Sequence, residues 1–118
     1  MISMYAIPNC DTVKKARIFL EKNHINYEFI DFKKNPPTKA QIQAWADDVG
    51  ELPINKKGTT YRKHKDLYES LSAPQKMDFI IENTSLIKRP VLVENNRVIA
   101  IGFDEDHYKN LIKNPGNK

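Results

Sequence analysis

The sequence predicts an α/β fold in which strands near both ends of the chain form one sheet and helices fill the middle. Two observations lead to this prediction. Apolar runs typical of strands occur at residues 2–7, 26–32 and 91–101, whereas residues about 38–83 show helical spacing. With 118 residues and 40% hydrophobic content, the chain has the length and composition of a single domain with one core.

The N-terminal part predicts a β-α-β unit. Residues 2–7 form a short apolar run that stops at Pro8-Asn9, as a buried strand does. A helical pattern then extends over residues 11–23, and residues 26–32 return to strand character. The apolar positions that recur at helical spacing are Val13, Ala16 and Leu20.

The middle of the chain carries two clear helix starts. Each is a capping box, in which a Ser or Thr is followed three residues later by Gln. The two pairs are Thr38 with Gln41 and Ser72 with Gln75. Gly50 is a typical stop for the first of these helices, and Trp45 is expected in its buried face. Residues 51–68 are polar and basic, so we expect a loop followed by a short helix there.

The C-terminal part predicts a β-hairpin and a last helix. Residues 91–93 and 98–101 are apolar and flank Asn95-Asn96, a two-residue turn signal. Helical spacing resumes through Tyr108, and a mobile tail is expected at residues 114–116.

This order of elements is typical of a thioredoxin-like fold, with a four-stranded mixed sheet and an all-helical insertion at about residues 38–83 of a single domain 1–118. In that fold the first and third strands are central, and the loop after the first strand lies at the end of the sheet. We therefore expect Cys10 to lie beside Arg89-Pro90, which directly precedes the third strand.

Cys10 is the chain's only cysteine, and it lies where the first strand meets the first helix. Backbone N–H groups at a helix start stabilise a thiolate, and Lys14 adds a cation one turn further on. Asp11 acts in the opposite direction, and the sequence leaves open whether it caps the helix or raises the thiol pKa. From position alone, Cys10 fits a nucleophile and a small buried apolar residue equally well.

Composition excludes several classes of protein. One cysteine allows no intramolecular disulfide, no apolar run reaches the roughly 20 residues of a membrane-spanning helix, and no export leader precedes the first strand. The net charge is +4, and the basic residues are densest at residues 56–65. This stretch matches no nucleic-acid motif, so we expect it to be a solvent-exposed basic surface. The three histidines lack metal-ligand spacing and are expected at the surface. We expect a cytoplasmic monomer with no tightly bound cofactor, no direct nucleic-acid contact and no membrane contact.

Four stretches together match a known family: residues 5–16, 57–63, 87–93 and 102–103, in the family's order. They resemble the arsenate reductase-like (ArsC/Spx) family, most closely its YffB-like branch. The resemblance implies a thioredoxin fold with a helical insertion, a nucleophilic Cys10, and an anion-binding Arg89 followed by a cis Pro90. Further candidates for binding a substrate or anion are Thr12, Lys14 and Lys57.

The sequence also departs from this family. Of the three arginines of arsenate reductases only Arg89 is present, since the other positions correspond to Asn55 and Gly102, and the histidine before the cysteine corresponds to Ala6. The second cysteine of the Spx redox switch is replaced by Val13.

The resemblance therefore implies a glutathione-dependent thiol reductase, with glutathione as co-substrate and a small thiol or oxyanion as substrate. The alternative is a non-catalytic, Spx-like adaptor or regulator whose basic insertion binds a protein partner.

Overall fold

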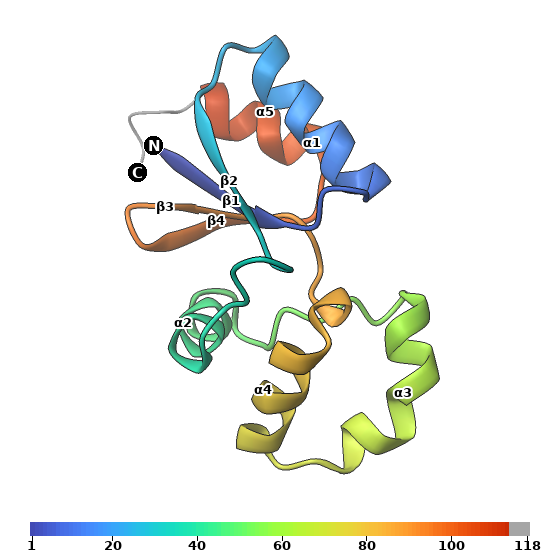
Figure 1. The fold of residues 1–118 in the computed structure, drawn as a ribbon. Coiled ribbons are helices and arrows are strands. Elements are labelled where there is room, and N and C mark those ends of the chain that lie inside the picture. The colour runs from blue at the N-terminus through green and yellow to red at the C-terminus, as the bar shows by residue number, and fades with distance from the viewer. Residues whose placement is uncertain (114–118) are drawn as a thin grey trace. The chain divides into compact units, whose positions relative to one another are not determined.

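The computed structural model describes residues 1–113 and shows two compact units (Figure 1). The first unit combines residues 1–30 with the chain from residue 89 onward, and the second comprises residues 31–88. The first contains β1 (Ile2–Ala6), α1 (Asp11–Lys22), β2 (Tyr27–Asp31, ending at the boundary), β3 (Val91–Glu94), β4 (Arg97–Ile101) and α5 (Glu105–Lys113). The second contains α2 (Lys39–Val49), α3 (Thr59–Ser70), α4 (Ala73–Glu82) and the 3-10 helix η1 (Thr84–Leu86). The tail expected at residues 114–116 lies outside the described residues.

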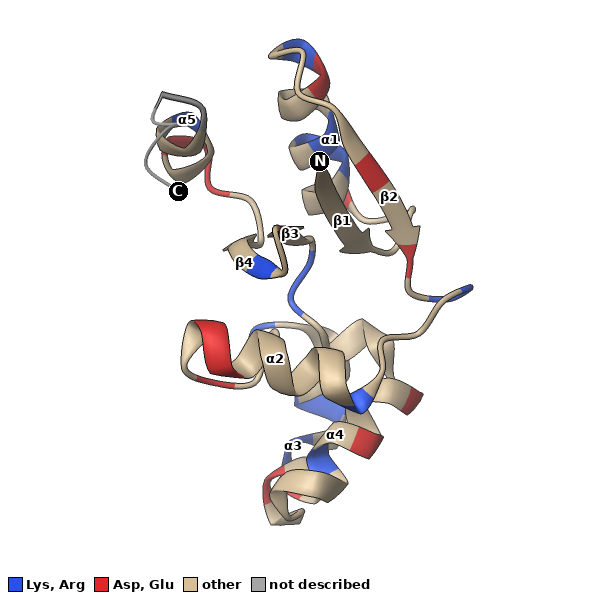
Figure 2. Cartoon of the chain, turned by 90° about the vertical axis from the view of Figure 1, so that its left-hand side faces the viewer, with Lys and Arg blue, Asp and Glu red and all other residues tan. Residues whose placement is uncertain are grey.

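The four strands form one mixed sheet in the order β2-β1-β3-β4. β1 pairs antiparallel with β3, with Met4 opposite Leu92, and β3 pairs antiparallel with β4. The arrows of β1 and β2 point the same way, as a β-α-β unit requires (Figure 2). The predicted thioredoxin-like arrangement, with the first and third strands central, is therefore confirmed.

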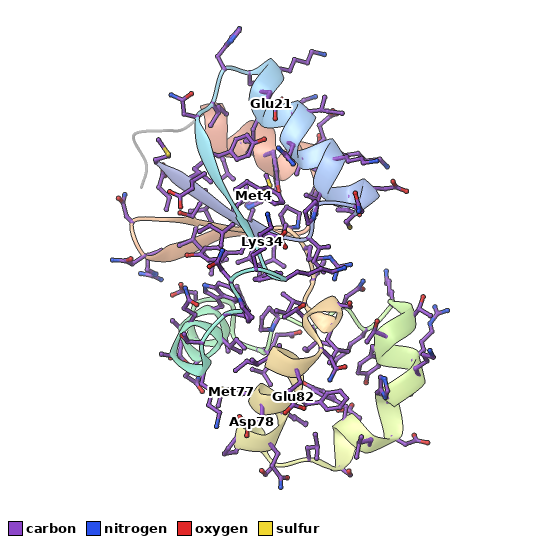
Figure 3. The ribbon with its side chains drawn as sticks, viewed as in Figure 1. Met4, Glu21, Lys34, Met77, Asp78 and Glu82 are labelled. Atoms are coloured by element: carbon purple, nitrogen blue, oxygen red, sulfur yellow. The ribbon has the colours of Figure 1, made fainter. Side chains whose placement is uncertain are left out.

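Helices α1 and α5 cover the same face of this sheet (Figure 1). Met4 is fully buried and lies between the sheet and these helices (Figure 3). The other members of this core are Ala6, Val13, Ala16, Leu20, Leu92, Ala100 and Tyr108. The rings of Phe19, Phe103 and Tyr108 pack against one another, which joins α1 to the start of α5. The helical spacing of Val13, Ala16 and Leu20 thus places one face of α1 in the core.

In the second unit, α2 and α4 begin as the sequence predicts. Both capping boxes are formed, with the Thr38 and Ser72 side chains each accepting from the backbone N–H three residues later. Gly50 ends α2 with a φ of 90°, a left-handed conformation that glycine adopts without a steric penalty. Trp45 is buried as expected, with its ring centroid 6.1 Å from that of Phe32. An ion pair of 2.8 Å between Lys39 and Asp78 links α2 to α4.

A loop and a short helix were expected at residues 51–68, but the helix is longer than expected and extends past residue 68. The helix α3 has 12 residues, Thr59–Ser70. Only Tyr61 and Tyr68 are buried on it, and the ring of Tyr68 packs against Phe79 of α4. Contacts with another helix therefore stabilise a segment whose own pattern is weak.

Within residues 1–113, no helix is both long and apolar enough to cross a lipid bilayer.

Candidate active site

Cys10 occupies the N-cap position of α1, at the junction that the sequence predicts. Its backbone is extended, with φ −118° and ψ 128°, so the chain turns from β1 into the helix at this residue. The side chain is half-buried and packs against the core beneath α1. The thiol is therefore held by the fold and remains accessible to solvent.

Arg89 approaches this thiol from a distant part of the sequence. Its Nη2 lies 3.9 Å from Cys10 Sγ, although 79 residues separate the two. The pairing of β1 with β3 brings the end of β1 close to the segment that enters β3. The peptide bond between Arg89 and Pro90 is cis, and the Pro90 carbonyl oxygen accepts a 2.9 Å hydrogen bond from the Gly102 N–H. The expected juxtaposition of Cys10 with Arg89-Pro90 is confirmed.

The pKa of the Cys10 thiol lies below its ordinary value. Burial raises this pKa, but the effects that favour the thiolate together outweigh burial. They are the backbone N–H of Val13, the hydrogen bond and positive charge of Arg89, and the backbone N–H of Thr12. The Cys10 side chain forms no capping hydrogen bond that satisfies strict geometry, so the N–H groups act on the sulfur as partial positive charges at the helix start.

The side chains of the neighbouring residues Thr12, Lys14 and Asp11 are not among the groups that shift the thiol pKa, and substrate or anion binding by Thr12 and Lys14 stays a prediction. Thr12 acts on the sulfur through its backbone, while its side chain is exposed. Lys14 is exposed and donates its backbone N–H to the Cys10 carbonyl oxygen, and it is not among the groups that lower the thiol pKa. Asp11 is the first residue of α1, not its N-cap, and has no part in that shift. The sequence did not single out Val13 as a site residue, although the third residue after an N-cap is a usual N–H donor.

Three further positions singled out in the sequence are Lys57, Gly102 and Ala6. Lys57 lies in the second unit, is exposed, and donates its backbone N–H to Asn55 Oδ1 at 3.2 Å. Gly102 lies in the first unit with a φ of 77° and has no side chain to offer. Ala6 is fully buried in β1.

The three histidines are dispersed. His24 and His107 are exposed as expected, but His64 is half-buried with its ring 5.5 Å from that of Phe79, so the expectation was wrong for this residue. In the part of the chain that the structure describes, no three His, Cys, Asp or Glu side chains are grouped to hold a metal ion.

Comparisons with known proteins agree with this fold. The family model described as "ArsC family" matches residues 5–111. The chain is 30% identical over 112 residues to the global transcriptional regulator Spx of Streptococcus agalactiae, covering 92% of this chain and 81% of the relative. A solved structure named YffB protein matches with a TM-score of 0.83 and 31% identity, covering 93% of this chain and 97% of the other. The structure of a possible arsenate reductase from Streptococcus mutans matches with a TM-score of 0.78 and 32% identity. The match covers 95% of this chain and 98% of the other. The family match spans the cysteine loop, the helical insertion and the hairpin, and the chain belongs to the ArsC family.

Proposed function

We propose that the protein is a glutathione-dependent thiol reductase in which Cys10 is the nucleophile. The observation that carries the proposal is a thiol of lowered pKa, 3.9 Å from an arginine, in a chain with no second cysteine. A thiolate attacks disulfide sulfur, and the thiol form does not. Because the chain cannot close a disulfide on itself, an external thiol must complete the cycle, and glutathione is the abundant candidate.

The reaction balances in two exchanges. Cys10 thiolate attacks the glutathione sulfur of a mixed disulfide, so that the Cys10–glutathione bond forms and the substrate leaves as a thiolate. A glutathione thiolate then attacks the same glutathione sulfur, forming oxidised glutathione and regenerating the Cys10 thiolate. In sum, one mixed disulfide and one reduced glutathione give the free substrate thiol and one molecule of oxidised glutathione. The Arg89 guanidinium stabilises negative charge on Cys10 as it attacks and as it leaves.

Arsenate is a poorer substrate in this proposal. Of the three arginine positions of arsenate reductases, two hold Asn55 and Gly102, which carry no charge. A lysine such as Lys57 does not reproduce the planar, bidentate contact of a guanidinium. We therefore expect arsenate turnover with glutathione to be at least about tenfold below turnover of a glutathione mixed disulfide.

The proposal is tested by intact-mass analysis after exposure to oxidised glutathione, followed by turnover of a glutathionylated substrate. We expect the wild-type protein to gain one glutathionyl group and excess reduced glutathione to remove it. Cys10→Ser should gain none and show no turnover. Lys63→Ala, which changes an exposed cation of α3, should behave as wild type. A folded wild-type protein that takes up no glutathione, or whose Cys10→Ser variant keeps its turnover, would show the proposal to be wrong.

A second candidate function is a protein-binding regulator, which the 30% identity to Spx supports. In this chain Val13 is fully buried in the core and occupies the position of the second Spx cysteine, so such a regulator would lack the disulfide within this motif. The glutathione experiment separates the candidates, because a regulator of this kind needs no turnover.

A further inference from the structure

A groove lies between α1 and α5 of the first unit, on the helical side of the sheet, and has no part in the proposed thiol chemistry. Its volume is about 780 Å³. The floor is apolar: Phe19 and Phe103 are half-buried with ring centroids 6.0 Å apart, and Ile18 leaves 64% of its surface exposed. An aliphatic side chain this exposed beside two aromatic rings forms an apolar surface that a partner could cover.

The rim of this groove is cationic. Lys15 and Lys22 lie one on either side of Ile18 along α1 and are exposed, and among the described residues neither is paired with a carboxylate. Lys109 completes the rim from α5, where it forms an ion pair of 3.5 Å with Glu105, so three lysines face one glutamate. Figure 2 shows the Lys and Arg positions of α1 in blue.

We propose that the α1–α5 groove binds an acidic amphipathic segment of a protein partner. An apolar anchor of that segment would cover Ile18 and contact Phe19 and Phe103, and its flanking carboxylates would pair with Lys15 and Lys22. A helix of 12 residues such as α1 is about 18 Å long, so the groove matches two to three turns of a partner helix with apolar residues at i, i+3, i+4 and i+7. This binding does not depend on the reactivity of Cys10.

Charge complementarity selects this occupant over the alternatives. A second copy of the chain, docked groove to groove by a two-fold axis, would place lysines against lysines, which is unfavourable. Residues 114–118 contain no Asp, Glu or large apolar side chain, so this stretch does not match the occupant. The phosphates of a nucleic acid would pair with the lysines, but a nucleic acid has no aliphatic side chain to cover Ile18.

The test measures binding of a fluorescent probe peptide to the full chain carrying Cys10→Ser, so that thiol chemistry plays no part. The probe is an amphipathic peptide of roughly four helical turns, with Leu and Phe at the anchor positions and Glu elsewhere. We expect saturable binding that weakens as salt rises, and amide chemical-shift changes confined to α1 and α5. Ile18→Glu and Lys15→Glu should each raise the dissociation constant at least about tenfold, and Ile18→Ala should raise it less.

Matched controls lie on α3. Leu67→Glu replaces another exposed aliphatic residue, 53% exposed, and Lys63→Glu reverses another exposed cation; both should leave binding unchanged. The proposal is overturned if no binding is found up to about millimolar peptide, if the α3 variants weaken it equally, or if a peptide with Lys in place of Glu binds as well. It is also overturned if oligouridylate or phosphatidylserine-containing vesicles bind through Ile18 and Lys15 while the acidic peptide does not.

Discussion

At the scale of single residues, the Arg89 guanidinium is the one side chain among the groups that favour ionisation of Cys10. Burial of the thiol opposes ionisation, and the N–H groups of Thr12 and Val13 belong to the backbone, so side-chain substitution leaves them in place. Arg89 supplies both a hydrogen bond and a positive charge. It is therefore the side chain through which the thiol pKa can be changed most directly.

Arg89→Ala is expected to raise the pKa of the Cys10 thiol. The thiolate loses its cation while the burial that disfavours it remains, so the pH at which half of the thiol is ionised moves upward. Alkylation by iodoacetamide, followed against pH, should reach half its maximal rate at a higher pH than in wild type, and its rate at neutral pH should fall several-fold. The half-maximal pH of Arg89→Lys should lie between those of wild type and Arg89→Ala, because lysine keeps the positive charge but lacks the planar guanidinium.

Lys22→Ala is the matched control, since it removes an exposed cation at the other end of α1. Its alkylation profile should overlay the wild-type profile. An unchanged profile in Arg89→Ala, or an equal shift in Lys22→Ala, would mean that the contact at 3.9 Å does not tune the thiol.

At the scale of elements, helix starts in the second unit differ in how they are held. Thr38 caps α2 with its hydroxyl oxygen, which accepts from the Gln41 N–H at 3.1 Å, and the Gln41 side chain accepts in return from the Thr38 N–H at 3.0 Å. The N-cap of α3 is Gly58, which has no side chain to cap with. Loss of the threonine hydroxyl is therefore expected to weaken α2 at its N-cap Thr38 and to leave α3 nearly unchanged at its first residue, Thr59.

Thr38→Ala is expected to lower the free energy of unfolding by about 1 kcal/mol, because the Gln41 N–H loses its acceptor. Thr59→Ala is the control: it removes a hydroxyl from the exposed first residue of α3, where that hydroxyl forms no capping bond, and should change stability by less than about 0.5 kcal/mol. Urea denaturation of both variants measures the difference. Equal losses would contradict a specific role for the capping box.

The same contrast explains which elements could be predicted from the sequence. Each capping box consists of a hydroxyl and an amide only three residues apart, so the starts of α2 and α4 could be predicted from the sequence alone. α3 has a glycine N-cap and two buried tyrosines seven residues apart, and its packing partner Phe79 lies on another helix. A local pattern cannot reveal a helix stabilised mainly by such contacts.

The candidate site divides in the same way. Cys10 could be predicted from its local place at a strand-to-helix junction, and Arg89 from the strand order together with the family resemblance. The groove could not, because Ile18 and Phe103 come together only when α1 and α5 lie on one face of the sheet. Lys57 stays a prediction, since it belongs to a different compact unit from Cys10.

At the scale of the whole molecule, each compact unit carries its own spectroscopic or chemical reporter. The only cysteine, Cys10, lies in the first unit, and the only tryptophan, Trp45, lies in the second. Each unit also has a fully buried aliphatic residue, Leu92 on β3 and Ile80 on α4. The stability of each unit can therefore be followed in the intact chain.

Leu92→Ala is expected to destabilise the first unit by about 2–5 kcal/mol, because truncation leaves a cavity among the packed core residues. Labelling of Cys10 under denaturant should then show its transition at a lower urea concentration. Ile80→Ala should lower the transition reported by Trp45 fluorescence by a comparable free energy, since Ile80 is also fully buried. The exposed Ile18→Ala is the control and should move neither transition by more than about 1 kcal/mol. If the Cys10 transition of Leu92→Ala is unchanged, the core beneath α1 does not hold the thiol in place. The structural explanation for the lowered thiol pKa would then be wrong as well.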